Sequence, residues 1–510
     1  MKKILGLLCL FSLCFTCKNT STPPDSIAIS ELTISGIHKA YSNYEYTSEL
    51  LVQAYLERIK KYDSTINAIT YINPDALALA KSLDEEYEKT GELRPLHGIP
   101  VIVKDNINVV GMPTTAGSLA LQNYYPDHDA FIIEKLKNAG AIILAKSNMA
   151  EWAFSPMHSE SSTHGTTRNP YNTNYVPAGS SGGTGASVSS NFGTVGLGTD
   201  TGNSIRGPSS HCSLVGFRTT LGLISRSGIV PLFLRNDVVG PMCRTVEDAT
   251  RLMQVMAGYD VSDPITEYAQ GKTVPDYQKY LLKNGLEGAR IGVLRELIGD
   301  EADPEIKTLF EKAIVDLDSL GANIIDPVVV PDFEALSEDQ WCATFRKDLE
   351  SFLKDFVKSD SLQTINDIIR IETKSEFSKE RLEAYASLKG RWGKDSADCL
   401  DAYTDTRRIA FREAIRNVMD SLKLDAIVYP SWQNRPATII NFEEEYKGDN
   451  NQIISPHTGQ PAFTVPMGHI SGNLPGGLQF LGRMYDEATL VKLCYAYEQG
   501  TKNRKPPLLK

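Results

Sequence analysis

One stretch of the sequence decides the fold, residues Val176–Arg226: VPAGSSGGTGASVSSNFGTVGLGTDTGNSIRGPSSHCSLVGFRTTLGLISR. Glycine and serine at this density are typical of a flexible linker. Large apolar residues nevertheless recur through it, among them Val188, Phe192, Leu197 and Phe217, and a linker needs none of them. The pattern therefore indicates a buried, tightly turning backbone, with glycine where φ is positive or where other atoms approach the main chain closely.

The segments on either side alternate between strands and helices. Residues 99–103 form a β-branched run typical of a buried strand, residues 129–140 have a helical pattern, and residues 141–148 predict a second buried strand. The same alternation returns around residues 289–297 and 426–430. Repeated alternation of this kind predicts an α/β fold. We expect a single large domain whose central mixed, largely parallel sheet is flanked by helices.

Composition limits the classes of function. The 510 residues are 41% apolar, which is enough for a substantial core. The net charge is −11 and no run of Lys or Arg is present, so a nucleic-acid partner is not expected. The cysteines after residue 17 are far apart, odd in number and without a C-x-x-C pair, so neither a disulfide framework nor a metal site is predicted; they are Cys212, Cys243, Cys342, Cys399 and Cys494.

The first residues predict export. Lys2 and Lys3 precede the apolar run Ile4–Phe15, which is too short to span a bilayer and is typical of a signal peptide. Cys17, at the end of this run, resembles the lipidation site of a bacterial lipoprotein; simple cleavage and release, or a leader without a lipidation site, are the alternatives. We expect the protein in the cell envelope, with the membrane reached only through a lipid anchor. The predicted division is a signal over 1–17, a tether over 18–28 and a catalytic domain over 29–510.

Three kinds of site fit the glycine-serine stretch. Glycine-rich turns before helices bind phosphate, but neither G-x-x-x-x-G-K-[ST] nor G-x-G-x-x-G after a strand is present. Residues 179–183 satisfy G-x-S-x-G with Ser181 as nucleophile, but no apolar strand precedes them. The third interpretation is a serine activated by a lysine whose pKa burial has lowered. Lys104 ends an apolar strand and is so placed, although Lys146 ends AIILAK in the same way.

Several spaced motifs resemble those of the amidase signature family. Besides PAGSSGGTGAS and GTDTGNSIRGP, they are LHGIPVIVKDNI, STHGTTRNPYN, DVVGPMCRTVEDA and TGQPAFTVPMG. The resemblance extends from about Ser48 to Gln499 and is weakest between Pro264 and Lys447. It implies the amidase signature fold and hydrolysis of a carboxamide to a carboxylic acid and ammonia or amine through a serine acyl-enzyme. It implies no cofactor and no metal.

The resemblance also implies a Ser–cis-Ser–Lys triad. The family's lysine falls on Lys104 in VIVKDN, its bridging cis-serine on Ser180 in GSSGG, and its nucleophile on Ser204 in GTDTGNSIR. In these roles Lys104 would draw a proton through Ser180 from Ser204, which would attack the amide carbonyl. The nucleophile expected on this basis is Ser204 and not Ser181.

Further residues acquire roles from the same resemblance. Backbone N–H groups of Thr201, Gly202, Asn203 and Ser204 are expected to bind the oxyanion. Many family members have glycine at the position of Asn203; asparagine tolerates positive φ, and its side chain could narrow the pocket or touch the substrate. Side chains in EWAFSPM line an acyl pocket or belong to the core, two alternatives that the sequence leaves open; they are Trp152, Phe154 and Met157.

The remaining polar residues of these motifs are expected to be structural. Asp200 and Arg206 are predicted to brace the loop that carries Ser204. His158, His164 and His211 would be candidate bases in another fold, but here we expect them to support the structure.

Two alternative functions remain. One is the glutaminase-type component of an amidotransferase, which works in the cytoplasm with partner subunits; the leader argues against it. The other is a non-catalytic exported amide-binding protein, against which the presence of both Lys104 and Ser204 argues. The expected partner is a small-molecule or peptide amide, and nothing in the sequence predicts an oligomeric state.

Overall fold

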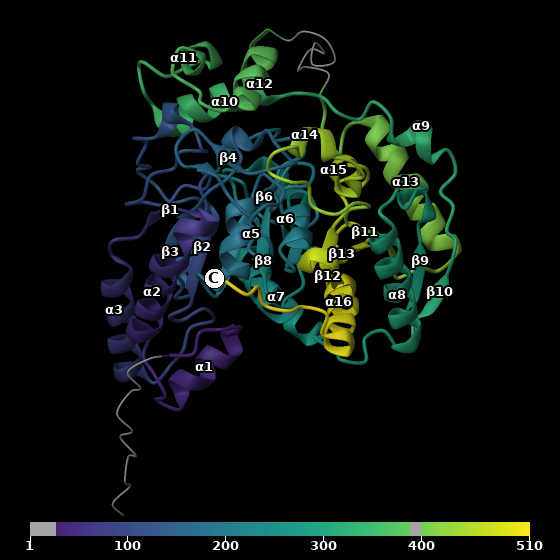
Figure 1. Ribbon diagram of the computed structural model, residues 1–510, viewed down its shortest axis with the longest axis horizontal. Coiled ribbons are helices and arrows are strands. Elements are labelled where there is room, and N and C mark those ends of the chain that lie inside the picture. The colour runs from purple at the N-terminus through teal and green to yellow at the C-terminus, as the bar shows by residue number, and fades with distance from the viewer. Residues whose placement is uncertain (1–26, 388–398, 510) are drawn as a thin grey trace, which may run out of the picture.

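An 11-stranded mixed sheet runs through the computed structural model, which describes residues 27–387 and 399–509 (Figure 1). The predicted signal, Cys17 and most of the predicted tether lie outside the described residues. In order across the sheet, the strands are β1 (Ile69–Ile72), β3 (Ile142–Ser147), β2 (Pro100–Lys104), β6 (Val195–Asp200), β8 (Val238–Cys243), β7 (Val215–Arg218), β12 (Ala462–Ile470), β13 (Leu474–Leu481), β11 (Ala426–Pro430), β9 (Arg290–Val293) and β10 (Asn323–Ile325). A separate small sheet pairs β4 (Glu160–Ser161) with β5 (Gly165–Thr166).

Parallel pairing occurs in two blocks of this sheet. Strand β2 pairs in parallel with β3 and β6, and β9 pairs in parallel with β10 and β11. The central strands β8, β7, β12 and β13 join the two blocks by antiparallel pairing. The predicted single α/β domain with a mixed sheet is therefore confirmed, and the predicted strand–helix–strand segments form its parallel blocks.

Helix boundaries follow from capping chemistry. Helix α2 begins after Thr47, whose hydroxyl accepts from the N–H of Leu50, and ends at Asn67 in a left-handed conformation. Helix α8 begins with Asp303 as N-cap and Pro304 in its first turn. The helices are α1 (Ile34–Ser42), α2 (Ser48–Ile66), α3 (Ala76–Thr90), α4 (Phe131–Asn138), α5 (Gly182–Ser189), α6 (Arg206–His211), α7 (Val246–Met256), α8 (Pro304–Ser319), α9 (Phe333–Ser337), α10 (Phe345–Phe352), α11 (Ile365–Ile369), α12 (Glu376–Ser387), α13 (Thr406–Ser421), α14 (Phe442–Glu445), α15 (Ser455–Thr458) and α16 (Glu487–Thr501).

The glycine-serine stretch forms the middle of the molecule. It contains α5, β6, α6 and β7, and every residue of α5 is buried. Helix α5 packs against β2, β6 and β8, while α6 packs against β7, β12 and β13. A Cβ at Gly183 would lie 2.1 Å from the carbonyl oxygen of Asn148, so only glycine fits there. Close approach of other backbone, rather than positive φ, explains this glycine.

A smaller hydrophobic cluster includes side chains of α10, α11 and α12, the helices at the top of Figure 1. It joins Trp152 and Phe154 to Phe345 and Tyr385.

In the part of the chain that the structure describes, no helix is both long and apolar enough to cross a membrane.

One prediction about the cysteines is wrong. Cys342 and Cys399 form a disulfide, with their Cα atoms 5.6 Å apart. The two residues are 57 positions apart in the sequence, and only the folded chain brings them together, so spacing alone carried no signal. Cys212, Cys243 and Cys494 are free and buried.

Candidate active site

Lys104 occupies the carboxyl end of β2 and is completely buried. Its Nζ donates to Ser180 Oγ at 2.7 Å and to Thr199 Oγ1 at 2.8 Å. No carboxylate of the described residues lies within ion-pair distance of this ammonium group. The ammonium group of Lys104 is therefore hydrogen-bonded to hydroxyl groups and shielded from solvent by the protein.

Burial sets the protonation state of Lys104. Desolvation lowers its pKa to about 7, and the more distant carboxylates of Asp200 and Asp237 oppose this shift without cancelling it. A lysine with this pKa is largely neutral just above pH 7 and can accept a proton. The sequence-based expectation of a lysine made basic by burial agrees with this environment.

Ser180 and Ser181 have different surroundings. The peptide bond between Gly179 and Ser180 is cis, as the family resemblance implied, and the Ser180 hydroxyl accepts the hydrogen bond from Lys104. Ser181, the N-cap of α5, donates to the carbonyl oxygen of Thr199 at 3.2 Å. No histidine of the described residues contacts Ser181, so the nucleophile-elbow interpretation lacks its base.

The N-terminus of α5 does not offer a phosphate site. The N–H of Gly182 donates to Ser159 Oγ at 2.9 Å, and the N–H of Gly183 donates to the carbonyl of Asn148 at 3.1 Å. These are the groups that would bind an anion at a helix N-terminus, and the protein already occupies them.

Ser204 lies in the turn that connects β6 to α6. Its side chain is 5% exposed and makes no hydrogen bond within the described part of the chain. The backbone N–H groups of Gly202, Asn203 and Ser204 likewise have no acceptor among the described residues. A turn with several unpaired N–H groups beside a free serine hydroxyl is suited to binding an oxyanion next to a nucleophile. The backbone N–H of Thr201 also has no acceptor among the described residues, while its hydroxyl donates to Asp237 Oδ1 at 2.6 Å.

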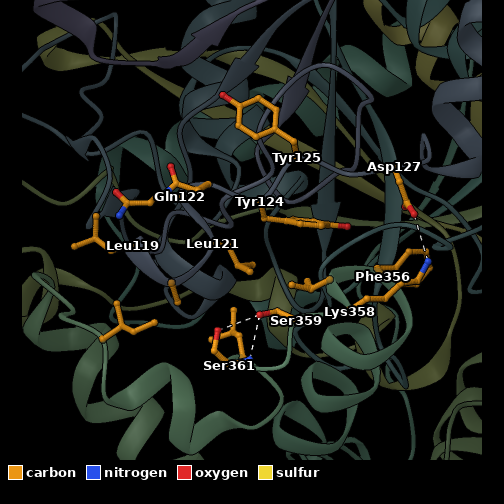
Figure 2. Close-up of a pocket in the computed structure, with 15 residues that line it drawn as sticks. Leu119, Leu121, Gln122, Tyr124, Tyr125, Asp127, Phe356, Lys358, Ser359 and Ser361 are labelled. Carbon is orange, nitrogen blue, oxygen red and sulfur yellow. Dashed lines mark hydrogen bonds and ion pairs between the residues drawn. The ribbon is translucent and has the colours of Figure 1, made fainter.

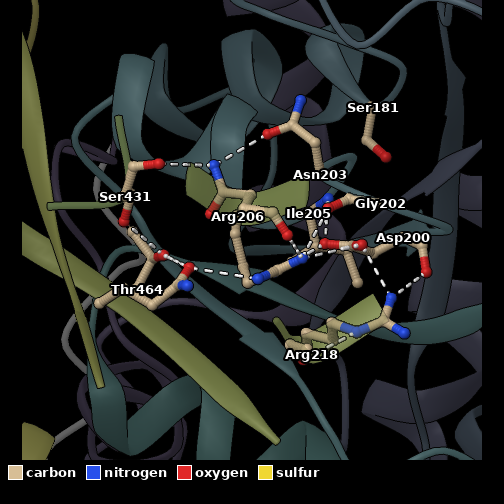
Figure 3. A network of polar contacts seen from close by, with 12 residues as sticks. Ser181, Asp200, Gly202, Asn203, Ile205, Arg206, Arg218, Ser431 and Thr464 are labelled. Carbon is tan, nitrogen blue, oxygen red and sulfur yellow. Dashed lines mark hydrogen bonds and ion pairs between the residues drawn. The ribbon is translucent and has the colours of Figure 1, made fainter. Parts of the chain in front are cut away.

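Asp200 forms a network of ion pairs with two arginines beside this turn (Figure 3). Asp200 pairs with Arg206 at 3.0 Å and with Arg218 at 2.8 Å, and all three side chains are fully buried. Burial raises the pKa of Asp200, but the two guanidinium groups more than offset this and lower it to about 2. Arg206 also donates to the carbonyl of Gly202 at 2.8 Å. Asp200 and Arg206 thus brace the Ser204 turn, as predicted, and Arg218 is a partner that the motifs did not indicate.

The side chain of Asn203 is buried and hydrogen-bonded to other parts of the chain. The carboxamide is 1% exposed; Nδ2 donates to the carbonyl oxygens of Gly179 at 2.9 Å and Pro156 at 3.1 Å, and Oδ1 accepts from Asn451 at 3.0 Å. Its φ is not positive. Asparagine therefore does not strain the turn, and its carboxamide links the Ser204 turn to Gly179, the residue before Ser180.

The three residues of EWAFSPM are all largely buried. Phe154 packs edge-on against Phe345 with ring centroids 4.7 Å apart. The ring centroids of Trp152 and Phe345 are 6.1 Å apart. Trp152 is 1%, Phe154 7% and Met157 9% exposed. Trp152 and Phe154 belong to the hydrophobic cluster of Phe345 and Tyr385.

The histidines have structural surroundings. His158 bonds to Ser155 Oγ at 2.8 Å and stacks on Phe442 at 3.7 Å. His211 is buried against Trp432, and burial lowers its pKa to about 3, so it is uncharged. His164 accepts from Asn67 through its main-chain carbonyl at 2.6 Å. Within the described residues none of the three contacts Ser180, Ser181 or Ser204.

A hollow of about 520 Å³ lies apart from these groups (Figure 2). Its lining includes Tyr124, Tyr125, Phe356 and the ion pair between Lys358 and Asp127, but none of the triad residues. It offers no base next to a nucleophile. Among the described residues, no cluster of three His, Cys, Asp or Glu side chains is arranged to hold a metal ion.

Thr199 and Asn451 are residues of the site that sequence reasoning missed. Thr199 is the second hydroxyl partner of Lys104, and Asn451 reaches Asn203 from 248 positions away. Neither has a local signal, since threonine and asparagine are common in any strand end or loop. Thr199 reaches Lys104 because β6 pairs with β2, and Asn451 reaches Asn203 because the segment before α15 meets the Ser204 turn.

Known proteins resemble this chain over nearly its whole length. The family model described as Amidase matches residues 50–491. A probable amidase of Arabidopsis thaliana is 34% identical over 501 residues, which cover 94% of this chain and 92% of that protein. One component of the glutamyl-tRNA(Gln) amidotransferase of Thermoanaerobacter pseudethanolicus is 34% identical over 496 residues, covering 93% of this chain and 98% of that protein. The crystal structure of a peptide amidase from Stenotrophomonas maltophilia superposes with a TM-score of 0.83 at 34% identity, covering 95% of this chain and 99% of that one.

Proposed function

Because the chain belongs to the amidase signature family and is a hydrolase acting on amides, we propose that Ser204 is its nucleophile, Ser180 the relay and Lys104 the base. The observation that carries this assignment is the 2.7 Å hydrogen bond from Lys104 to Ser180 in a site where no carboxylate neutralises the lysine. Only a lysine that exchanges its proton near neutral pH is useful as a base.

In the first half-reaction, neutral Lys104 takes the proton of Ser180, and Ser180 takes the proton of Ser204. The Oγ of Ser204 then bonds to the amide carbon, and the carbonyl oxygen becomes an oxyanion beside the free N–H groups of the turn 202–204. The C–N bond breaks as the relayed proton passes to the leaving nitrogen. The products of this step are ammonia or an amine and an acyl ester on Ser204.

In the second half-reaction, a water molecule gives its proton to the same relay and attacks the ester carbon. The bond between Ser204 Oγ and the acyl carbon breaks, Ser204 regains its proton, and a carboxylic acid leaves. Peptide amides are the substrate class that the similarity to the Stenotrophomonas maltophilia peptide amidase supports.

Ammonia release from a panel of simple and peptide amides tests the assignment. Ser204→Ala is expected to lower turnover by about 10⁴-fold or more. Ser181→Ala is the matched control, since Ser181 lies in the same stretch and is hydrogen-bonded to Thr199, and it should keep most of the activity. A fluorophosphonate that labels Ser181 and leaves Ser204 unmodified would contradict the assignment.

The same assay separates the alternatives. The glutaminase-type component of an amidotransferase needs its partner subunits for the full reaction, whereas the proposed enzyme turns over amides alone. An amide-binding protein without catalysis would bind the panel and release no ammonia above the Ser204→Ala background.

We also propose that the protein is exported and anchored by a lipid at Cys17. The disulfide between Cys342 and Cys399 supports export, because disulfides form and persist mainly in oxidising compartments. Fractionation of cells that express wild type or Cys17→Ser tests the anchor. The wild type should sediment with membranes and the variant should not; equal membrane association of the two proteins would refute lipidation.

A further inference from the structure

The side chains of Gln452 and Trp341 lie next to Gly202. Gly202 belongs to the turn 202–204, whose N–H groups have no acceptor among the described residues. A Cβ at Gly202 would lie 2.7 Å from Gln452 Oε1 and 2.8 Å from Trp341 Cη2. Any residue other than glycine would require both side chains to shift. The Gln452 carboxamide and the Trp341 ring therefore lie against the turn to which a substrate carbonyl would bind.

Hydrogen bonding determines which atom of the Gln452 carboxamide faces Gly202. Burial raises the pKa of Asp449 to about 7, so at pH 8 its carboxylate only accepts, and the hydroxyl of Tyr446 donates to Asp449 Oδ2 at 3.0 Å. The oxygen of Tyr446 is then left to accept, and it does so from Gln452 Nε2 at 3.0 Å. The amide nitrogen of Gln452 therefore points to Tyr446, and Oε1 points to Gly202.

The Oε1 atom of Gln452 is available to a ligand. It makes no hydrogen bond within the described part of the chain, and the side chain is half-buried rather than sealed in the core. Trp341 is also half-buried, and its ring is supported edge-on by His457 at 4.6 Å. The site thus presents N–H donors on the turn and, directly beside them, one free acceptor and one aromatic surface.

This pairing of groups selects a particular kind of amide. A ligand that fills it needs a carbonyl oxygen for the turn and an N–H donor a few bonds away for Oε1. Simple acyl and aryl amides have no N–H on the acyl side. The C-terminal amide of a peptide has such an N–H: it is attached to the Cα that is bonded to the carbonyl carbon whose C–N bond is cleaved.

We propose that Gln452 determines specificity: its Oε1 accepts a hydrogen bond from the backbone N–H of the residue whose terminal amide is hydrolysed, and Trp341 covers that residue's side chain. Preferred substrates are therefore amidated peptides and N-acylamino acid amides. This inference rests on the proposed function, because it needs the substrate carbonyl at the Ser204 turn.

A pair of substrates that differ in one group tests the inference. N-acetylphenylalaninamide carries the N–H; 2-acetoxy-3-phenylpropanamide has an oxygen in its place and the same leaving group. Ammonia release at pH 8 gives kcat/KM for each. The wild type is expected to prefer the N–H substrate by about 10-fold, the usual value of one hydrogen bond between neutral groups. Gln452→Leu should abolish this preference by slowing only the N–H substrate.

Two further variants separate recognition from folding. Tyr446→Phe removes the partner that orients the carboxamide, so it should reduce the preference without removing it. Gln433→Leu is the matched control: Gln433 donates to Asn450 Oδ1 at 3.0 Å in the same region without contacting Gly202, and it should leave the preference unchanged.

The possible failures are distinguishable. If the wild type releases no ammonia from either substrate or from 3-phenylpropanamide, the proposed function itself fails. If it hydrolyses 3-phenylpropanamide as fast as N-acetylphenylalaninamide, only the role of Gln452 is wrong. Equal slowing of both paired substrates by Gln452→Leu would also overturn that role, since it would place Oε1 on the turn or on the leaving amide.

Discussion

Lys104 and Lys146 end neighbouring parallel strands, and both are fully buried, yet their surroundings are opposite in kind. Lys104 Nζ bonds to the hydroxyls of Ser180 and Thr199. Lys146 Nζ lies 3.3 Å from Asp105 Oδ1 and also donates to two backbone carbonyls and to Thr114 Oγ1. Burial lowers the pKa of both lysines, but at Lys146 the adjacent carboxylate of Asp105 opposes this shift, whereas Lys104 has no carboxylate within ion-pair distance among the described residues and is the better placed base.

Strand register explains the difference. Lys146 pairs with Val103, and Lys104 pairs with Ser147. Side chains alternate between the faces of a strand, so the two lysines point to opposite faces of the sheet. Ser147 bonds to Thr184 of α5 at 2.7 Å, which marks the face of Lys104 as the one that α5 covers. Lys104 therefore meets the Ser180 loop, and Lys146 meets the loop of Asp105 and Thr114.

The largest effect expected is on catalysis. Lys104→Met should lower kcat by about 10⁴-fold with little change in the far-UV circular dichroism spectrum, because a methionine fills the space but accepts no proton. Steady-state ammonia release measures the loss. A variant with more than a tenth of wild-type kcat would remove the distinction between the two lysines.

Lys146→Met should act on stability instead. It leaves the carboxylate of Asp105 buried without a counter-charge, which costs about 3–5 kcal/mol of unfolding free energy. Urea unfolding followed by tryptophan fluorescence measures this loss. The fraction that remains folded should keep wild-type kcat per active site, titrated with a fluorophosphonate; a loss of kcat equal to that of Lys104→Met would make the two lysines equivalent.

The pH dependence of kcat/KM comes next in size. Desolvation lowers the pKa of Lys104 to about 7, so the base is protonated and inactive below this pH and neutral above it. Activity should therefore rise with pH, by about 10-fold per unit below the inflection, and level off above it. A profile that is flat from pH 5 to pH 9 would show that no group with this pKa is required.

The smallest effect is expected from the matched hydroxyls. Thr199→Val removes an acceptor from Lys104 and should lower kcat/KM by about 10-fold or less, with the inflection moved to lower pH because the charged form loses a partner. Thr114→Val removes the corresponding hydroxyl of Lys146 and should change neither quantity. Equal effects of the two substitutions would mean that the hydroxyl contact of Lys104 has no catalytic consequence.

Local pattern predicted a large part of the fold. The buried strands β2 and β3 follow from short apolar runs, and helix α4 follows from the helical pattern of residues 129–140. Motif resemblance predicted the positions of Lys104, Ser180 and Ser204, and the structure brings Lys104 and Ser180 into contact across 76 residues. The disulfide and the free acceptor of Gln452 had no such signal, because each depends on two segments that meet only in the folded chain.

The sequence by itself determined the fold class, the buried character of the stretch from Val176 to Arg226 and the family, because these are written in local spacing and composition. Only the tertiary structure decided that Lys104 and not Lys146 contacts Ser180. It also decided which groups the Asn203 side chain bonds to and which side chains lie next to Gly202. These properties depend on strand register and on contacts between segments that lie far apart in the chain, as Asn203 and Asn451 do across 248 positions. A pattern of neighbouring residues does not encode such contacts.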